Sequence, residues 1–267
     1  MFHSRPRDPA PRAEAEEPLP PPPGGAIRPG DLSRLVREAL EGHRVQMEFQ
    51  PIAMVGATGP DMLFEGFARI LDAGGQVIPA TRFMGAVEES TIGRDLDCAA
   101  LRLGLTALRA HPWLRLAVNA SARSLENATW RSTLEAAMGE VGERLTLEVG
   151  EGSATLLADR VARFMAELRP RGLRFVLDDF GIGPLSLRQL RDFRFDGVKI
   201  DRSFVKDIDR SPENQALVGA LVSVAHRFGM TAVAKGVETL GEAARLRVLG
   251  ADGLQGFLFG RPGALPE

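Results

Sequence analysis

Eight short apolar runs, rich in β-branched residues, are spaced through this chain of 267 residues. From the second run onward, segments with helical periodicity separate them. Strands that alternate with helical crossovers over a chain of this length predict a single α/β domain, a (β/α)8 barrel of the TIM type. The runs are MEFQPIAMV, MLFEGFARI, LRLAVNAS, RLTLEVGE, LRFVLDDF, DGVKIDRS, TAVAKGVE and LQGFLFG.

The first two runs depart from this alternation. Only GATGPD separates them, which is too short for a parallel crossover, so the two should pair as an antiparallel hairpin. We therefore expect a barrel with one antiparallel strand. Before the hairpin, DLSRLVREALEG has a capping Asp31, helical apolar spacing and a glycine stop, which together predict a first helix.

The N-terminal segment differs in composition from the rest. Residues 1–30 hold nine of the 18 prolines and few large apolar side chains, so they cannot offset the entropy of ordering. We predict a disordered proline-rich tail over 1–30 and a barrel domain over 31–267. The tail could contact a protein partner, although a solvated leader is the simpler interpretation.

Composition excludes several classes of function. The formal net charge of -2 gives no electrostatic footprint for duplex nucleic acid or an anionic membrane. No apolar run approaches 18 residues and the N-terminus lacks a secretion signal, so we expect a cytoplasmic protein. The single cysteine, Cys98, excludes a disulfide framework and lies in a helical apolar pattern, which favours a packing role.

Polar residues stand at the ends of the predicted strands, the edge of a barrel where active sites form. One such residue usually caps the next helix, but a set of four carboxylates would repel one another by roughly 4 kcal/mol per close pair at an effective dielectric of about 20. A hard divalent cation, Mg²⁺ or Mn²⁺, would relieve that repulsion. Two such ions about 4 Å apart suit in-line hydrolysis of a phosphodiester. The residues are Glu65, Asn119, Glu148, Asp178, Asp179, Lys199, Lys235 and Gln255.

From about Gln46 to Pro262 the chain resembles the EAL family of bacterial cyclic di-GMP phosphodiesterases, which are barrels with one reversed strand. The resemblance rests on eight motifs in the family's order and spacing. They are FQPI, FEGFARI in place of the Glu-Ala-Leu signature, VNAS, LEVGE, LDDFGIG, VKIDRSFV, AKGVET and LQGFLFGRP.

The resemblance implies a role for each matching residue. Glu65, Asn119, Glu148 and Asp178 would hold a first metal, and Asp178 with Asp179 a second. Lys199 would orient the attacking water or the scissile phosphate, and Glu151 would anchor the loop after LDDFG. Three further positions would touch the ligand: Gln50, Arg69 and Gln255. For Arg69 a simple ion pair remains an alternative, and a homodimer is suggested by resemblance alone.

Lys235 stands where the family has a glutamate that ligates the second metal. An ammonium about 4 Å from a divalent ion would cost on the order of 8 kcal/mol at an effective dielectric of about 20. We expect Lys235 to exclude or weaken the second metal; the alternative is a lysine that points into solvent and leaves partial activity. Ile182 and Pro184 are smaller departures, in the loop after the aspartates.

Three functions stay open at this point. The chain could be a slow cyclic di-GMP phosphodiesterase, a silent cyclic di-GMP receptor that signals by protein contact, or a scaffold that works through its barrel surface and tail without nucleotide. Retention of Gln50, Arg69 and Gln255 argues against the scaffold.

Overall fold

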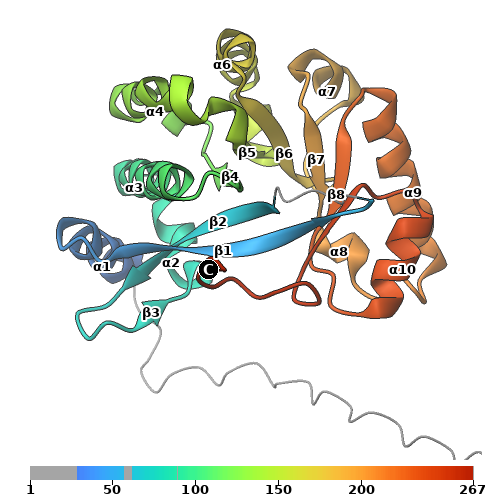
Figure 1. The fold of residues 1–267 in the computed structure, drawn as a ribbon, viewed down its shortest axis with the longest axis horizontal. Helices are drawn as coiled ribbons and strands as arrows, with labels where there is room; N and C mark the ends of the chain where they lie inside the picture. Colours follow the sequence, from blue (N-terminus) through green and yellow to red (C-terminus); the bar gives the residue numbers. More distant parts are fainter. Residues whose placement is uncertain (1–28, 57–61, 89, 267) are drawn as a thin grey trace, which may run out of the picture.

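The computed structural model describes residues 29–56, 62–88 and 90–266. Eight strands close into a barrel in the order β1-β9-β8-β7-β6-β5-β4-β2, and a short β3 is added at the edge of β2 (Figure 1). The (β/α)8 prediction is therefore confirmed. The strands are β1 (Val45–Met54), β2 (Met62–Leu71), β3 (Val77–Ile78), β4 (Leu114–Asn119), β5 (Leu145–Gly150), β6 (Arg174–Phe180), β7 (Gly197–Ile200), β8 (Thr231–Ala234) and β9 (Gly253–Gln255).

β1 is the reversed strand. It runs antiparallel to both of its neighbours, β2 and β9, whereas the other strands of the ring pair in parallel. The short link between β1 and β2 allows no crossover helix, which explains the reversal. The expected hairpin and the single antiparallel strand are both confirmed.

Helices cover the outside of the barrel (Figure 1). Several begin at the polar caps that the sequence provides: Ser186 and Thr239 each form a capping box, and Ser90 accepts hydrogen bonds from Ile92 and Gly93. The helices are α1 (Pro29–Glu41), α2 (Ala80–Val87), α3 (Thr91–Ala110), α4 (Ala128–Val141), α5 (Glu151–Leu156), α6 (Ala158–Leu168), α7 (Leu187–Phe193), α8 (Arg202–Val205), α9 (Pro212–Arg227) and α10 (Leu240–Val248), with 3-10 turns η1 (Ser124–Glu126), η2 (Gly142–Arg144) and η3 (Arg169–Arg171).

Two apolar clusters stabilise the described residues. The larger one fills the barrel and the layer between strands and helices, and it includes the fully buried Trp130 and Phe175. The smaller one joins α1, α2 and the start of α3 through residues such as Val36 and Phe83. Cys98 is buried in the larger cluster, as its helical pattern predicts.

Residues 1–28 lie outside the described part of the chain, so the tail over 1–30 stays a prediction, except that α1 begins at Pro29, two residues before the expected boundary. Among the described residues, none of the helices combines the length and the apolar character that crossing a bilayer requires.

Candidate functional site

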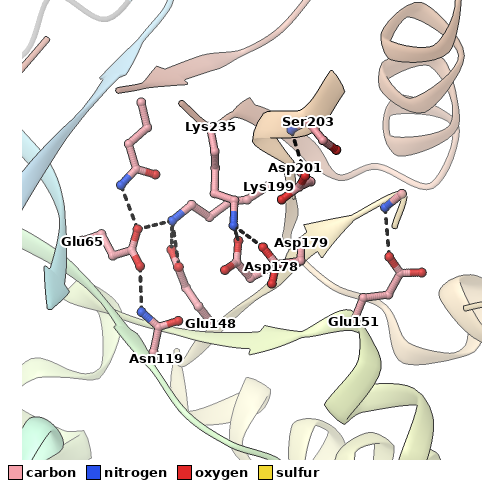
Figure 2. A network of polar contacts seen from close by, with 12 residues as sticks. Glu65, Asn119, Glu148, Glu151, Asp178, Asp179, Lys199, Asp201, Ser203 and Lys235 are labelled. Carbon is pink, nitrogen blue, oxygen red and sulfur yellow. Dashed lines mark hydrogen bonds and ion pairs between the residues drawn. The ribbon is translucent and has the colours of Figure 1, made fainter. Parts of the chain in front are cut away.

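A cavity of about 1090 Å³ opens at the rim of the barrel where the parallel strands end. We call it the rim site. It gathers most of the strand-end residues expected from the sequence, and Figure 2 shows their side chains pointing toward one another. The expected residues that line it are Gln50, Glu65, Asn119, Asp178, Asp179, Lys235 and Gln255.

Lys199, on β7, lies directly beneath the cavity. Its side chain is only 1% exposed, and its ammonium nitrogen lies 2.5 Å from Glu65 Oε2 and 2.8 Å from Glu148 Oε2. The two acids come from β2 and β5, so one buried cation joins three strands across the barrel (Figure 2). A buried charge needs partners of this kind.

Side-chain amides complete the coordination of Glu65. Asn119 Nδ2 donates to Oε1 at 2.7 Å, and Gln255 Nε2 donates to Oε2 at 2.8 Å. Gln255 also donates to Gln50, whose own amide donates to the carbonyl of Gly260. Residues from β1, β2, β4 and β9 are thereby held in one hydrogen-bonded group.

The charges in this group shift one another's pKa. Burial alone would lower the pKa of the Lys199 ammonium, but Glu148 and Glu65 outweigh it and raise that pKa. Burial opposes ionisation of Glu65 too, yet Lys199 and the amide donors lower its pKa below the ordinary value. Burial and the neighbouring charge of Glu65 raise the pKa of Glu148 well above its ordinary value. We infer that Lys199 stays charged and that Glu65 is its carboxylate partner.

Lys235 follows β8 directly and also points into the rim site (Figure 2). Its Nζ lies 2.6 Å from Asp178 Oδ1, an ion pair, and 2.5 Å from Asp179 Oδ1, a hydrogen bond. Its side chain is 18% exposed, so the orientation is not the solvent-facing alternative. Burial would lower the pKa of Lys235, but Asp178 and Asp179 raise it above the ordinary value. Lys235 is therefore an ammonium placed between two carboxylates.

A β-bulge explains how two adjacent aspartates reach the same lysine. Neighbouring residues of a regular strand point to opposite faces. The pairing of β6 with β7 shifts register between Leu177 and Phe180, and Asp179 has φ 57, the left-handed region that non-glycine residues seldom adopt. This local distortion turns Asp179 toward Asp178 and Lys235.

Glu151 holds the loop that follows the aspartates. Its buried carboxylate accepts hydrogen bonds from the backbone N–H groups of Gly181, Gly183 and Leu185. Gly183 fits this arrangement because a Cβ there would lie 2.7 Å from Glu151 Cδ. The position of Glu151 beside this loop matches the anchoring role that the resemblance implies.

Two residues lie differently from a simple strand-end arrangement. Glu65 is inside β2, which continues to Leu71 because its hairpin with β1 runs up to the pairing of Val45 with Ile70. Arg69 is outside the cavity lining, where its Nε donates to Glu48 Oε2 at 2.8 Å. Its guanidinium also lies 5.3 Å from the ring centroid of Phe67, which does line the cavity.

Sequence reasoning missed part of the cavity wall. Arg202 and Lys206 line it from the α8 region, and Phe257 is a half-exposed aromatic ring with Arg261 stacked at 4.3 Å. The basic pair was detectable, because both residues closely follow the VKID strand end. Phe257 was harder to detect as a cavity residue, because LQGFLFG has the pattern of one apolar strand, whereas the observed β9 ends at Gln255.

The donor set around Glu65 fits a hard cation in its chemistry. Glu65, Asn119, Glu148 and Asp178 can supply oxygen ligands, although Asp178 Oδ1 already lies 2.6 Å from Lys235 Nζ. As they lie, however, no three acidic, imidazole or thiol groups among the described residues are grouped around a metal position, and the four carboxylates contact the ammonium groups of Lys199 and Lys235 instead. The place between Asp178 and Asp179 does not fit a second ion, since Lys235 Nζ stands there.

Comparisons with known proteins agree with this architecture. The EAL domain family profile matches residues 33–262. The cyclic di-GMP phosphodiesterase NbdA of Pseudomonas aeruginosa is 32% identical over 235 residues, which are 85% of this chain and 30% of NbdA. The chain thus spans about a third or less of the length of such curated relatives.

Solved structures give the same result. The EAL domain of FimX from Pseudomonas aeruginosa, bound to c-di-GMP, matches with a TM-score of 0.79 and 25% identity, over 88% of this chain and 97% of that domain. The MucR phosphodiesterase in its c-di-GMP complex, from the same organism, matches with a TM-score of 0.74 and 29% identity, over 87% and 97%.

Proposed function

This chain belongs to the EAL domain family, and on that premise we propose that its rim site binds cyclic di-GMP and hydrolyses it slowly to the linear dinucleotide. The observation that carries the proposal is the ion pairing of Lys235 Nζ with both Asp178 and Asp179. It leaves Glu65, Asn119 and Glu148 outside this ion pair but engages Asp178, and it disables the neighbouring site.

The retained residues divide the work of hydrolysis. Glu65, Asn119, Glu148 and Asp178 would hold one divalent cation, Mg²⁺ or Mn²⁺. Such an ion lowers the pKa of bound water and stabilises charge on the phosphoryl oxygens. Lys199, freed from part of its ion pairing, would orient the attacking water or the phosphate. Attack by water on phosphorus breaks one ester bond to a 3′ oxygen, which leaves as a hydroxyl after taking a proton.

Lys235 limits this reaction through charge. A glutamate replaced by lysine changes the local charge by two units, and an ammonium about 4 Å from a divalent ion costs on the order of 8 kcal/mol at an effective dielectric of about 20. The ammonium offsets one of the two negative charges of Asp178 and Asp179 but cannot acidify water as a metal does. Turnover should therefore fall much further than binding.

The same ion pair favours a second candidate, a receptor that binds cyclic di-GMP without cleaving it. Because Lys235 and Lys199 offset part of the negative charge of the four acids, the rim site can approach the ligand phosphates without a second metal. Gln50, Gln255 and Arg69 are the proposed ligand contacts in both cases. A receptor would pass its signal on by contact with a protein partner or with a second copy of the chain.

One experiment separates the two candidates. Cyclic di-GMP turnover is followed by chromatography of the linear product for the wild type and Lys235→Glu, in Mg²⁺ and in Mn²⁺. Binding is measured by calorimetry in Ca²⁺. We expect the wild type to bind cyclic di-GMP and the variant to cleave it at least tenfold faster than the wild type does. A tenfold change in rate is a modest part of the activation free energy that a second metal removes.

Lys206→Glu is the matched control, because Lys206 also lines the cavity but has no ion pair with Asp178 or Asp179 among the described residues. A wild type without turnover whose glutamate variant cleaves would be a receptor. Equal turnover in the wild type and Lys235→Glu would contradict the charge argument, and absence of cyclic di-GMP binding would contradict both candidates.

A further inference from the structure

A second cavity, of about 440 Å³, lies at the other end of the barrel from the rim site. Phe195 and Asp196 precede β7 and Gly229 precedes β8, and all three line it, so it opens at the N-terminal ends of these strands. The end of α7, η3 and the end of α9 form its sides. Its volume lies in the range of small-molecule sites, roughly 300 to 1,000 Å³. We call it the basic pocket.

Four arginines line the basic pocket against one acid. Arg169 comes from η3, Arg191 and Arg194 from the end of α7, and Arg227 from the end of α9. The acid, Asp196, is already engaged by Arg169 Nη2 at 2.5 Å and by the N–H of Phe175 at 2.8 Å. The pocket therefore carries a local positive excess, although the chain as a whole is slightly acidic.

Donor capacity in the pocket is left unused. Within the described part of the chain, Arg194 and Arg227 form no ion pair or side-chain hydrogen bond, and the buried Arg169 Nη1 has no hydrogen-bond partner. Arg194 has φ 57, a strained conformation for a non-glycine residue. Because Arg194 is the C-cap of α7, helix termination accounts for this conformation, whereas the buried donor of Arg169 calls for a ligand, since buried donors are seldom left unsatisfied in proteins.

Phe228 adds an aromatic surface to the same wall. It is 39% exposed and lies beside Arg227 at the end of α9. An exposed ring next to guanidinium groups matches a ligand with a flat base and a negative charge. Guanidinium forks bind phosphate through two parallel hydrogen bonds.

We propose that the basic pocket binds a phosphate-bearing ligand of mononucleotide size, separately from the rim site. Arg194, Arg227 and Arg169 hold the phosphates, and Phe228 stacks on the base. The site is independent of the hydrolytic or receptor function at the rim, because no residue lines both cavities.

The test is calorimetric titration of the full chain in EDTA, which removes metal-dependent binding of phosphate at the rim. The probes are inorganic pyrophosphate and GTP. We expect both to bind the wild type and the double variant Arg194→Ala/Arg227→Ala to weaken both by at least about tenfold, as for loss of charge-assisted contacts. The matched control is Arg37→Ala/Arg82→Ala, which removes two exposed arginines from α1 and α2.

Phe228→Ala identifies the source of the phosphate. If the variant binds GTP more weakly than the wild type but binds pyrophosphate unchanged, the result supports a nucleotide. If it binds both probes as the wild type does, the result supports free phosphate as the ligand. Thermal unfolding followed by circular dichroism checks that each variant is folded. If the double alanine variant does not fold, Arg194→Lys/Arg227→Lys replaces it, with the same direction of effect because lysine lacks the guanidinium fork.

Three results would overturn the proposal. The first is a wild type that binds neither probe. The second is a double variant that binds both probes as the wild type does. The third is poly-glutamate binding as tightly as pyrophosphate, which would make the pocket a contact for acidic protein surfaces.

Discussion

Replacing Lys235 by glutamate should make folding stability depend on metal. In EDTA the change removes the cation between Asp178 and Asp179 and adds a third carboxylate. Asp178 is only 15% exposed, so its new repulsion counts most, at about 4 kcal/mol for a pair near 4 Å at an effective dielectric of about 20. Asp179 is 47% exposed and adds little because solvent screens it.

For a barrel of this size, about 4 kcal/mol corresponds to a Tm lower by roughly 8 to 16 °C. Manganese should reverse most of that loss. At about 100 times its Kd, an ion that binds only the folded state contributes about 2.7 kcal/mol, or roughly 5 to 11 °C. In the wild type the rise in Tm with manganese is limited to the binding of an ion by the ligands around Glu65, because Lys235 occupies the position between Asp178 and Asp179.

The assay is thermal unfolding followed by circular dichroism, with EDTA or with increasing MnCl₂, for the wild type, Lys235→Glu and Lys206→Glu. Lys206 is exposed, so its variant should unfold near the wild-type temperature in EDTA and gain no more from manganese than the wild type does. A wild type whose Tm rises with manganese as steeply as that of Lys235→Glu would refute the reasoning.

Three further outcomes are expected. Lys199→Met leaves Glu65 and Glu148 buried without their cation, so it should cost about 3 to 5 kcal/mol of unfolding free energy in urea titrations without metal. Glu151→Gln weakens the acceptor of three backbone amides, so hydrogen exchange over 181–185 should accelerate while the barrel strands stay protected. Burial raises the pKa of Asp97, so the folded state keeps that proton to higher pH than the unfolded chain does, and this contribution to stability is lost as pH rises through the folded pKa. Asp97→Asn should therefore gain in stability over the wild type as pH rises above 3.8, the ordinary pKa of the carboxyl, and a constant difference in urea midpoints would contradict this.

Periodicity was enough to predict the barrel. The runs that became β5 and β7 are nearly continuous in apolar character, as strands covered on both faces must be, and the intervening segments have helical spacing. The link between β1 and β2 fixed the reversed strand by its length. β3 was not predicted, because two residues carry no period, and the end of β9 was placed too late, because the apolar residues after Gln255 belong to a turn.

The clustering of the strand-end residues was predictable from the sequence, but their pairing was not. Strand ends and motif order bring Glu65, Glu148, Asp178 and Lys199 together. No pattern states which acid each lysine contacts, because that depends on the bulge in β6 and on depth within the barrel. The sequence did not determine whether the Lys235 side chain points into solvent or into the site. In the structure it points into the site, because Asp178 and Asp179 provide partners at hydrogen-bond distance.

The reversed strand β1 also affects how the chain is made. Its second partner, β9, and Gly263, which forms an isolated bridge with Phe49, come from the far end of the sequence. At roughly 5 to 20 residues per second, the ribosome needs about 10 to 40 seconds to synthesise the intervening chain. During that interval β1 presents an unpaired edge, which is a template for pairing with other chains. For this barrel, synthesis is the stage most exposed to aggregation, and any factor that covers β1 until β9 emerges would raise the yield of folded protein.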